Sequence, residues 1–597
     1  MKTFLRALSL KTLTFFMIVM AKSSLLSCLT LLILLHLPIA TQAGCDPSSA
    51  CWPTDTEIED LEKLLDPSLD RSGLYRIDDS APADGGSPYP SAIPIFSGGD
   101  QPLYGFGDIK DLKPLYVNVQ STREDECFVN SSFLKPENRD ICFVSTRNSP
   151  YSGTTTQADT GTPGFVVFPV TASQVQSAVQ FAKKHDLCIS VLGTGHDFLD
   201  RHSNCEFGML IRTSLLKDME VIPSQNATKL GSGLTFSEVQ AFLSPKNFYV
   251  ASGWSVTVGI LGWSIGGGHG PFAPSAGLGV DNIIEFDIVT ADGELRTCNS
   301  ENDNSDLFWA VRGGGGSTWG VITSISLKLH SLPEQGATLL QFYSEGIYCD
   351  KELVENGVDA YISVLPELDE RWSGLTFITP TNSKTTEDCG LKYSAFNLYV
   401  FMGTEEEAQE GISKFLEVGM VKILSRPIHS WYDDYLRLAD VEYISPTANM
   451  APTDEKVGGV PSVLVPREKN EELANFVKFR LADCSSDPTI CGRIEIYHCI
   501  TGHSKQHFDA EAVSITSAFR SSLYHVVTGG GNSDQMDKAY EMLGDHCYPN
   551  ECAYSISEES GGWESRRYGE QYERLSTVKN KYDPEGVFFC KHCIGDV

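Results

Sequence analysis

The chain has 597 residues, with 46 Lys and Arg against 78 Asp and Glu, so its formal net charge is −32. This acidity excludes nucleic acid as a partner, because binding a polyanion requires a basic surface that releases counterions. Hydrophobic residues make up 41% and charged residues only 21%, which predicts folded domains rather than disorder. At roughly 100 to 200 residues per domain, the length allows two to four folding units.

Residues 1–43 have the features of a secretory signal. Basic residues without any acid precede an apolar run over residues 25–40, and the small-residue sequence Thr-Gln-Ala follows at 41–43. A second apolar run over residues 13–20 leaves a signal anchor as an alternative, and Met20 is an alternative start. We expect cleavage, secretion and no membrane attachment afterwards, since no later stretch approaches the roughly 20 apolar residues of a membrane helix.

The cysteine count fits an oxidising compartment. Of 17 cysteines one lies in the signal, and the even number that remains predicts a disulfide framework. Sequons at Asn130 and Asn226 predict N-glycans. Two cysteine pairs, 547/552 and 590/593, also have spacings that could ligate zinc. Because disulfides explain the same residues in a secreted chain, we expect no metal.

In the first half of the mature chain, the amino-acid composition and the hydrophobic pattern change near residue 160. Residues 44–159 are rich in Pro, Gly, Ser and Asp, with one clear helical stretch at 56–65, and predict an extended arm stapled by cysteines 45, 51, 127 and 142. A compact α/β lobe over residues 160–333 follows, opening with a β-α-β unit. Its expected elements are strands at 165–169, 189–192, 209–212, 283–290 and 320–330 and a helix at 172–185.

The second half alternates strand-like and helix-like segments over residues 334–545. Examples of these segments are 339–343, 352–365, 405–417, 469–481 and 493–500. The tail from residue 568 returns to one dense pattern, and no internal repeat is present.

Three glycine clusters lie at residues 193–195, 266–270 and 313–316. Glycine lets backbone N–H groups crowd around a phosphate, because no Cβ blocks the approach. A P-loop is excluded because no Lys-Ser/Thr follows any cluster, and the first cluster continues into His196 and so departs from the dinucleotide fingerprint. Tight turns explain any one cluster, but three together favour an elongated nucleotide.

Several segments resemble the berberine bridge enzyme-like branch of the vanillyl-alcohol oxidase/p-cresol methylhydroxylase flavoproteins, most closely its secreted fungal-type members. They are F-V-V-F-P at 165–169, V-L-G-T-G-H-D-F-L at 191–199, G-G-G-H-G at 266–270, G-L-G-V-D-N at 277–282, D-L-F-W-A-V-R-G-G-G-G at 306–316, and the tail over 568–588. The resemblance implies an α+β, two-lobed fold. The FAD-binding domain would be 160–333, completed by the C-terminal module 546–597, and the substrate domain 334–545 would be an antiparallel sheet covered by helices.

The resemblance also implies FAD, attached through its 8α position to His196. The family's second attachment is a cysteine in the pattern G-x-C-x-T-V-G, which here has Ser255 at the cysteine position, so we expect a single covalent link. The cofactor-binding residues implied are Gly193, Thr194, Gly195, His196, Asp197, Ser255, Thr257, Val258, Gly259, Gly266, Gly267, Gly268, His269, Asp281, Asn282, Gly320, Val321, Ile322 and Tyr572.

A catalytic base is required if a hydride passes from an alcohol, carbohydrate or amine carbon to flavin N5. Tyr554, and after it Glu558, falls near the family's Tyr-x-Asn segment, although the asparagine is replaced here. Glu495 and Tyr497 share one face of the strand 493–500. That face looks either onto the flavin, as an acid/phenol pair, or outward into solvent.

The electron acceptor depends on the position before Gly259. Val258 falls where the family's oxygen-access residue lies and favours an oxidase that uses O2. The alternatives are a dehydrogenase with a quinone or protein acceptor, and a secreted, non-catalytic binding or matrix protein on a flavoprotein scaffold. The expected partners are therefore a small-molecule substrate and O2.

Overall fold

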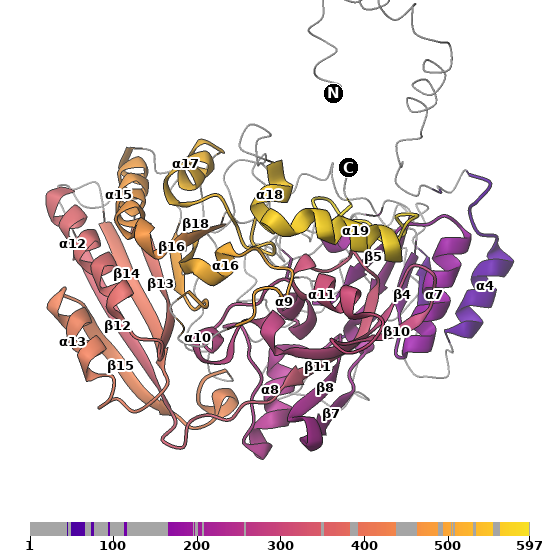
Figure 1. Cartoon of the computed structure of the whole chain (residues 1–597), viewed down its shortest axis with the longest axis horizontal. Coiled ribbons are helices and arrows are strands. Elements are labelled where there is room, and N and C mark those ends of the chain that lie inside the picture. Colours follow the sequence, from indigo (N-terminus) through magenta and orange to yellow (C-terminus); the bar gives the residue numbers. More distant parts are fainter. Residues whose placement is uncertain are drawn as a thin grey trace, which may run out of the picture. The chain divides into compact units, whose positions relative to one another are not determined.

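The computed structural model arranges the described part of the chain in four sheets and their covering helices (Figure 1). The described residues are 45, 49–65, 73–76, 93–95, 113–115, 165–194, 196–197, 201–203, 205, 208–255, 258–347, 351–381, 392–436, 462–486, 493–502, 504, 508–528, 533–552 and 562–595. The expected signal, the sequon at Asn130 and two of the arm's cysteines, 127 and 142, lie outside these residues.

The N-terminal helix α4 (Asp55–Leu64) packs on α7 (Ala172–Lys184). A capping box starts α4: Thr54 and Glu57 each accept a hydrogen bond from the other's backbone N–H. Gln174, in the first turn of α7, donates a 2.5 Å hydrogen bond to the carbonyl of Leu65 at the end of α4. The Cys45–Cys51 disulfide closes the turn that leads into α4.

The first sheet has the strand order β1-β4-β6-β5. The predicted β-α-β unit is present, with β6 lying between its two strands and pairing in parallel with both. Because β5 ends at Leu192, the chain enters the first glycine cluster directly from a buried strand. The strands are β1 (Gly73–Arg76), β4 (Phe165–Phe168), β5 (Ile189–Leu192) and β6 (Met209–Arg212).

The second sheet is antiparallel and has the order β10-β9-β11-β8-β7. The hairpin of β7 and β8, which sequence patterning missed, forms one edge. The elements are β7 (Met219–Ile222), β8 (Ala227–Gly231), β9 (Ile283–Val289), β10 (Leu295–Cys298), β11 (Val321–Lys328), α8 (Phe236–Leu243), α9 (Ile260–Ile265), α10 (Ala273–Ala276) and α11 (Ser305–Gly314). A short ribbon pairs β2 (Ile93–Ile95) with β3 (Lys113–Leu115).

The third sheet is the seven-stranded antiparallel layer expected for the substrate domain, with the order β15-β12-β14-β13-β17-β18-β16. Four helices cover one face and share a hydrophobic core with it (Figure 1). The strands are β12 (Ala337–Ile347), β13 (Trp372–Thr381), β14 (Lys392–Phe401), β15 (Val421–Ile428), β16 (Ser462–Pro466), β17 (Ile494–His498) and β18 (Ser522–Thr528). The helices are α12 (Lys351–Val364), α13 (Gln409–Glu417), α15 (Asn470–Ser486) and α17 (Ser533–Leu543).

A buried ion pair joins the two lobes. Arg520, on the short helix α16 (Ala518–Ser521), donates two hydrogen bonds of 2.7 and 2.6 Å to the carboxylate of Asp281. Arg312 adds hydrogen bonds to the carbonyls of Val280 and Ala512. These contacts position the sheet of the second lobe against the glycine-rich loops of the first.

The C-terminal segment, α18 (Gly562–Tyr568) and α19 (Tyr572–Tyr582), returns to the first lobe. The buried ammonium of Lys579 donates hydrogen bonds to the carbonyls of Thr318 (2.7 Å) and Phe588 (2.8 Å) and to the carboxylate of Asp583 (2.6 Å). Phe588 lies beside Ile189 as a one-residue parallel bridge to β5. The last residues of the chain thus complete the lobe that starts at β4.

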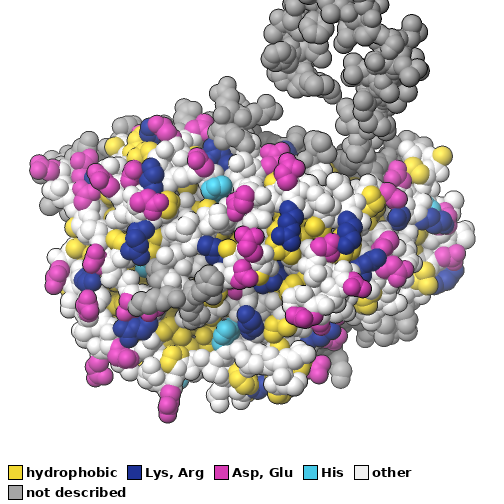
Figure 2. Space-filling view, in the orientation of Figure 1, with side chains coloured by type: hydrophobic (Ala, Val, Ile, Leu, Met, Phe, Trp, Pro, Cys, Tyr) yellow, Lys and Arg dark blue, Asp and Glu magenta, His cyan; other side chains and the backbone are white. Residues whose placement is uncertain are grey.

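The distribution of charged side chains on the surface is consistent with the excess of acidic residues in the sequence. On the face in Figure 2, acidic side chains are spread with Lys and Arg among them, rather than opposite one basic patch. Among the residues that the structure describes, no helix is long and apolar enough to cross a membrane.

We predict that Lys579→Met lowers the free energy of unfolding by about 3 kcal/mol, because it leaves the Asp583 carboxylate buried without its cation. The matched control is Lys581→Met, which breaks a half-exposed pair with Asp306 and should cost less than about 1 kcal/mol. Denaturant titration followed by tryptophan fluorescence measures both variants. Equal losses in the two would contradict the role given to Lys579.

Candidate functional site

A cavity of about 380 Å³ lies between the glycine-rich loops of the first lobe and the uncovered face of the seven-stranded sheet. It continues from the end of β5, past α9, to β13 and β17. The residues that line it are Val191, Leu192, Gly193, Thr194, His196, Asp197, Arg201, His202, Thr213, Ser232, Gly253, Trp254, Ser255, Val258, Gly259, Leu261, Gly262, Trp263, Ile265, His269, Ile288, Gly315, Gly316, Ser317, Trp319, Gly320, Ile322, Phe377, Arg493, Glu495, Tyr497, Tyr548, Asn550 and Glu551.

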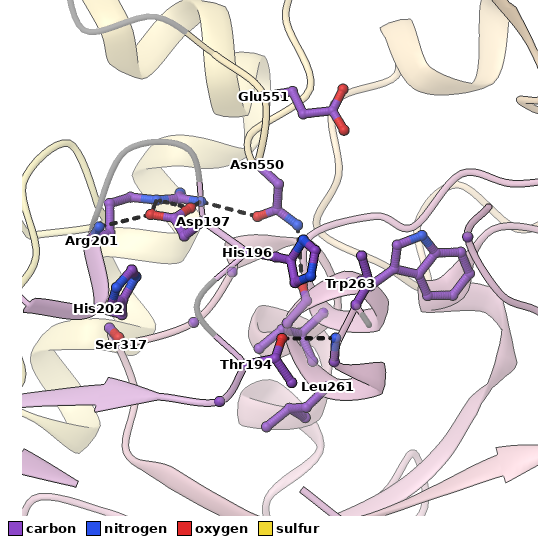
Figure 3. Close-up of a pocket in the computed structure, with 18 of the residues that line it drawn as sticks. Thr194, His196, Asp197, Arg201, His202, Leu261, Trp263, Ser317, Asn550 and Glu551 are labelled. Carbon is purple, nitrogen blue, oxygen red and sulfur yellow. Dashed lines mark hydrogen bonds and ion pairs between the residues drawn. The ribbon is translucent and has the colours of Figure 1, made fainter. Parts of the chain in front are cut away.

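His196 lies at the centre of the loop end of this cavity (Figure 3). Burial lowers the pKa of its imidazole to about 4, so the ring is neutral at physiological pH. Thr194 fixes the loop by accepting a 3.0 Å hydrogen bond from the backbone N–H of Gly259. The arrangement presents an uncharged, nucleophilic imidazole in a buried wall.

A polar chain ties this loop to the far side of the cavity (Figure 3). Asp197 accepts hydrogen bonds from Arg201 Nε (3.0 Å) and Nη2 (2.5 Å), and Arg201 Nη2 also donates to Asn550 Oδ1 at 3.1 Å. Burial raises the pKa of Asp197, but Arg201 outweighs this effect and keeps the pKa below its usual value. Asn550 in turn donates to Tyr548 Oη (2.9 Å), so the chain continues into the segment that carries Glu551.

The loop end of the cavity fits a large polar cofactor. An added Cβ would meet no atom within 3.7 Å at Gly193, Gly315 or Gly316, so these backbones border open space. The hydroxyls of Thr213 and Ser232 also line the cavity, where they are buried and make no hydrogen bond to any described residue. Buried hydroxyls without partners in native proteins call for a ligand or water, and phosphate or ribose oxygens suit them.

Glu495 and Tyr497 lie on the opposite wall, on β17. Both line the cavity, and Tyr497 donates its hydroxyl hydrogen to Glu495 Oε2. Arg493 Nε donates to Glu495 Oε1 at 2.8 Å, and the Arg493 guanidinium stacks over the Phe377 ring at 4.3 Å. The alternation of residues along the strand left open whether the face with Glu495 and Tyr497 points inward or into solvent. In the structure this face points into the cavity. The same alternation places Arg493 on it, although sequence reasoning did not select that residue.

Burial raises the pKa of Tyr497 well above its usual value, and the neighbouring Glu495 carboxylate adds to the rise. The phenol therefore stays protonated and acts as a hydrogen-bond donor to Glu495. A substrate that approaches this wall meets a phenol hydroxyl backed by a carboxylate.

A second group of titratable side chains joins the same wall. His269 Nε2 lies 3.6 Å from Glu551 Oε1, and His525 Nε2 lies 3.4 Å from Glu551 Oε2. Burial lowers the pKa of His525 to about 3. Burial also lowers the pKa of His269, but Cys499 and Glu551 outweigh it and raise that pKa to about 10. The surroundings of His269 thus favour a positive charge.

Comparisons with known proteins agree with this geometry. The family model for an FAD binding domain matches residues 163–299, and the model for berberine and berberine-like proteins matches residues 547–595. The VAO-type flavoprotein oxidase VAO615 of Thermothelomyces thermophilus is 27% identical over 459 residues, which cover 72% of this chain and 76% of that protein.

Solved structures share the fold. The VAO-type flavoprotein MtVAO713 of Myceliophthora thermophila C1 superimposes with a TM-score of 0.67 at 20% identity, covering 92% of this chain and 96% of that one. Berberine bridge enzyme from Eschscholzia californica gives a TM-score of 0.60 at 20% identity, covering 80% of this chain and 96% of that one.

The chain therefore carries an FAD binding domain and a berberine-like domain, and its relatives are FAD-linked oxidoreductases of the vanillyl-alcohol oxidase and berberine bridge enzyme kind. The two family models match segments that meet at the Ile189–Phe588 bridge. The α+β fold expected from the sequence is confirmed.

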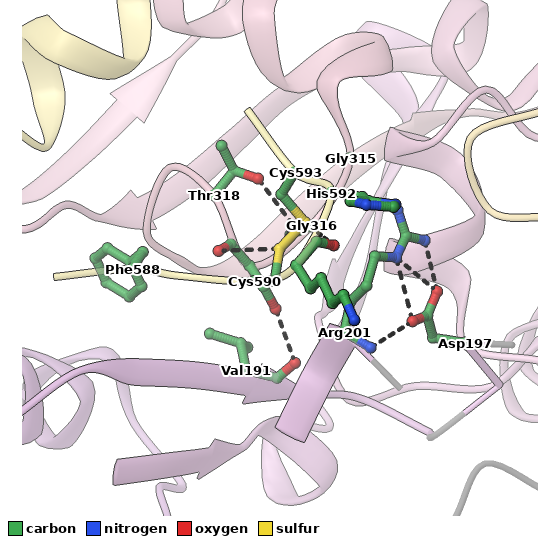
Figure 4. The surroundings of a disulfide bond; sticks show 12 residues. Val191, Asp197, Arg201, Gly315, Gly316, Thr318, Phe588, Cys590, His592 and Cys593 are labelled. Atoms are coloured by element: carbon green, nitrogen blue, oxygen red, sulfur yellow. Dashed lines mark hydrogen bonds and ion pairs between the residues drawn. A yellow bond between two sulfur atoms is a disulfide. The ribbon is translucent and has the colours of Figure 1, made fainter. Parts of the chain in front are cut away.

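The Cys590–Cys593 disulfide of this oxidoreductase lies against the third glycine cluster (Figure 4). Cys590 Sγ is 3.8 Å from the carbonyl oxygen of Gly316 and 3.7 Å from that of Ser317. Ser317 also donates to the carbonyl of Val191 at the end of β5. The cysteine pairs 590/593 and 547/552, whose spacings could also ligate zinc, form disulfides in the structure.

The cavity brings together about half of the residues that sequence reasoning assigned to the oxidoreductase's site. Those that line it are Gly193, Thr194, His196, Asp197, Ser255, Val258, Gly259, His269, Gly320, Ile322, Glu495 and Tyr497. Gly195, Thr257, Tyr554 and Glu558 lie outside the described residues. Asp281, Asn282, Val321 and Tyr572 are off the cavity: Asp281 holds Arg520, Asn282 contacts His330, Val321 is in the core and Tyr572 packs on Trp563.

The glycines at 266–268 have a different role from the one expected. A Cβ on Gly266 would fall 2.2 Å from Asn550 Nδ2, and one on Gly267 would fall 3.1 Å from the Tyr548 ring. Gly267 and Gly268 also have φ values of +130° and +75°. Gly266 and Gly267 therefore make room for Asn550 and Tyr548, whereas Gly268 faces Trp263 and Gly279. None of the three lines the cavity, and only His269 of this cluster does so.

We predict that acidification destabilises the oxidoreductase in part through His202, which lines the cavity. Burial lowers its pKa to about 4, so between pH 6.5 and 4 the unfolded chain binds a proton that the folded chain does not. The free energy of unfolding is therefore unaffected by the protonation of His202 above pH 6.5. It decreases as the pH falls below 6.5, by about 3 kcal/mol at most. His202→Gln should reduce the drop in melting temperature between pH 7 and pH 5.

The control for this experiment is His429→Gln, because His429 is exposed at the end of β15. That variant should follow the wild-type pH dependence. If the melting temperatures of wild type and His202→Gln fell equally between pH 7 and pH 5, His202 would not be a source of acid sensitivity.

Proposed function

We propose that this protein is a secreted oxidase that removes a hydride from an alcohol, carbohydrate or amine carbon and passes the electrons to O2. The observation that carries the proposal is the Arg493–Glu495–Tyr497 group on the cavity wall. FAD, when bound, supplies the hydride acceptor, and a proton acceptor must then take the O–H or N–H proton of the substrate.

Glu495 is the proton acceptor in this proposal. A substrate O–H or N–H donates to Tyr497 Oη while the phenol passes its own proton to Glu495 Oε2, so the phenol is restored and the carboxylate ends protonated. Arg493 orients the carboxylate through Oε1 and leaves Oε2 for this exchange. The wall excludes bulk water, because Glu495 is only 2% exposed.

His196 is the proposed attachment point of the flavin, through the 8α position. It lines the cavity and is neutral, so an unprotonated ring nitrogen of its imidazole can act as the nucleophile. Ser255 lines the same cavity where family members have their second, cysteinyl attachment. A hydroxyl is a much poorer nucleophile than a thiolate, so we propose one covalent link only.

Oxygen as acceptor is proposed from Val258, which lies half-buried on the cavity wall beside Gly259. One relative at 27% identity is a flavoprotein oxidase by name. Secretion is proposed from the sequence of residues 1–43 and from the disulfides at 45–51, 547–552 and 590–593. Asn226, the proposed glycan site within the described residues, is exposed in the β7–β8 turn.

We predict that His196→Ala abolishes the fluorescent flavin band of denatured, gel-separated protein, because the sole covalent link is lost. The native variant should still bind FAD and be yellow. Ser255→Ala is the matched control and should keep the band. A fluorescent band in His196→Ala would refute this attachment, and colourless wild-type protein would favour a non-catalytic binding protein.

We predict that Glu495→Gln lowers the rate of anaerobic flavin bleaching by substrate about 10²- to 10⁴-fold, the usual contribution of a general base. Tyr497→Phe should cause a smaller loss, since the Glu495 carboxylate itself lines the cavity and stays in place to accept the proton. A panel of oligosaccharides, benzylic alcohols and amines supplies the substrates. Glu417→Gln, at an exposed position, is the control.

The acceptor is tested with the same preparations. Photoreduced wild-type flavin should reoxidise rapidly in air with release of H2O2. Slow reoxidation in air with rapid reoxidation by a quinone would identify a dehydrogenase instead.

A further inference from the structure

We propose that His269, His525 and Glu551 bind a divalent transition-metal ion, such as Zn²⁺, in the wall of the cavity. The three side chains come from the loop after α9, from β18 and from the turn closed by the Cys547–Cys552 disulfide. They can each offer one ligand atom, and these atoms all lie within 4.8 Å of one another. The expectation of no metal rested on the cysteine pairs 547/552 and 590/593, which lie apart from His269 and His525 in the sequence.

The donor set and spacing suit such an ion. Two imidazoles and one carboxylate, with a fourth position open, are the ligands of many catalytic zinc sites, and they also suit Fe²⁺. Tetrahedral ligands at about 2.1 Å from zinc lie about 3.4 Å from one another. The Glu551 carboxylate lies near this separation from both imidazoles, at 3.6 Å from Oε1 to His269 and 3.4 Å from Oε2 to His525. Because each histidine faces a different oxygen, the carboxylate and the two rings must draw closer for three ligand atoms to bind one ion.

Unsatisfied polar atoms point to a missing ligand. His525 is fully buried, and neither of its ring nitrogens makes a hydrogen bond to any described residue. Glu551 Oε2 is likewise buried without a hydrogen-bond donor among the described residues. Leaving such groups unpaired costs roughly 1 to 3 kcal/mol each. A metal ion would satisfy His525 Nε2 and the Glu551 carboxylate with one bond each.

The neighbouring side chains hold the ligands in place. Cys499 Sγ lies 3.4 Å from His269 Nδ1, so the other nitrogen, Nε2, is the one that faces Glu551. Such a contact on the second nitrogen commonly orients a metal-binding histidine. The Tyr497 ring stacks on the His525 ring, and the Tyr548 ring meets both imidazoles edge-on.

The open position faces the cavity, because His269 and Glu551 both line it and Tyr497 stands beside them. An ion there would bind a hydroxyl or carboxylate oxygen of the substrate. Metal binding does not depend on the proposed oxidation, whereas this use of the metal does. The two ideas therefore fail separately: protein without metal that still oxidises substrates would refute only the present proposal.

The test is the metal content of the full-length secreted protein, purified without chelators and measured by plasma mass spectrometry. We expect about one transition-metal ion per chain in the wild type. His525→Gln and Glu551→Gln should each lose it, whereas His498→Gln should retain it. His498 is a matched control because it is a fully buried histidine on the adjacent strand β17, whose side chain lies on the face opposite Tyr497.

A second measurement covers variants that fold poorly. Wild-type protein stripped with a chelator should melt at a higher temperature when Zn²⁺ is restored, since a ligand of the folded state raises its stability. His498→Gln should show the same rise and Glu551→Gln should not. Metal-free wild-type protein whose melting temperature is unchanged by Zn²⁺, Mn²⁺ or Fe²⁺ would overturn the proposal and leave a buried histidine–carboxylate network.

Discussion

The buried ammonium of Lys579 is the contact on which the first lobe depends. It joins the loop after the third glycine cluster, through the carbonyl of Thr318, to two groups near the C-terminus, the carboxylate of Asp583 and the carbonyl of Phe588. A buried cation is stable only when all its protons have acceptors, and here each of the three does. The glycine loop of the cavity is thereby fixed by residues of the C-terminal segment. The same segment forms the parallel bridge to β5.

The cavity itself is a boundary between two kinds of wall. The loop end offers backbone and hydroxyl groups without net charge, which suits a polyanionic cofactor in a protein of net charge −32. The sheet end gathers Arg493, Glu495 and the histidines in a dry, aromatic setting. Electrostatic interactions are strongest where water is excluded, and the titratable side chains of Glu495, Tyr497 and Glu551 lie at that end.

Local patterns predicted much of the fold. The helical spacing of Val175, Ala178 and Val179 gave α7, and the alternation around Glu495 placed it and Tyr497 on one face. Whether that face points into the cavity or outward depends on which elements pack against β17. The alternation of residues along one strand carries no information about those elements. The glycines at 266–268 do not line the cavity for a related reason: a glycine is needed wherever anything approaches the backbone, and the side chain next to Gly266 is Asn550. Glu551 carries no local signal, because its partners come from β18 and from the loop after α9.

The Cys547–Cys552 disulfide closes the turn that presents Tyr548, Asn550 and Glu551 to the cavity. Its closure makes the far wall of the site a product of oxidative folding, and the Cys590–Cys593 disulfide, which lies against Gly316, does the same for the loop end. Protein made in a reducing cytoplasm would therefore lack a covalent constraint at both ends of the cavity. The choice of expression compartment decides how firmly the two walls are held in any preparation.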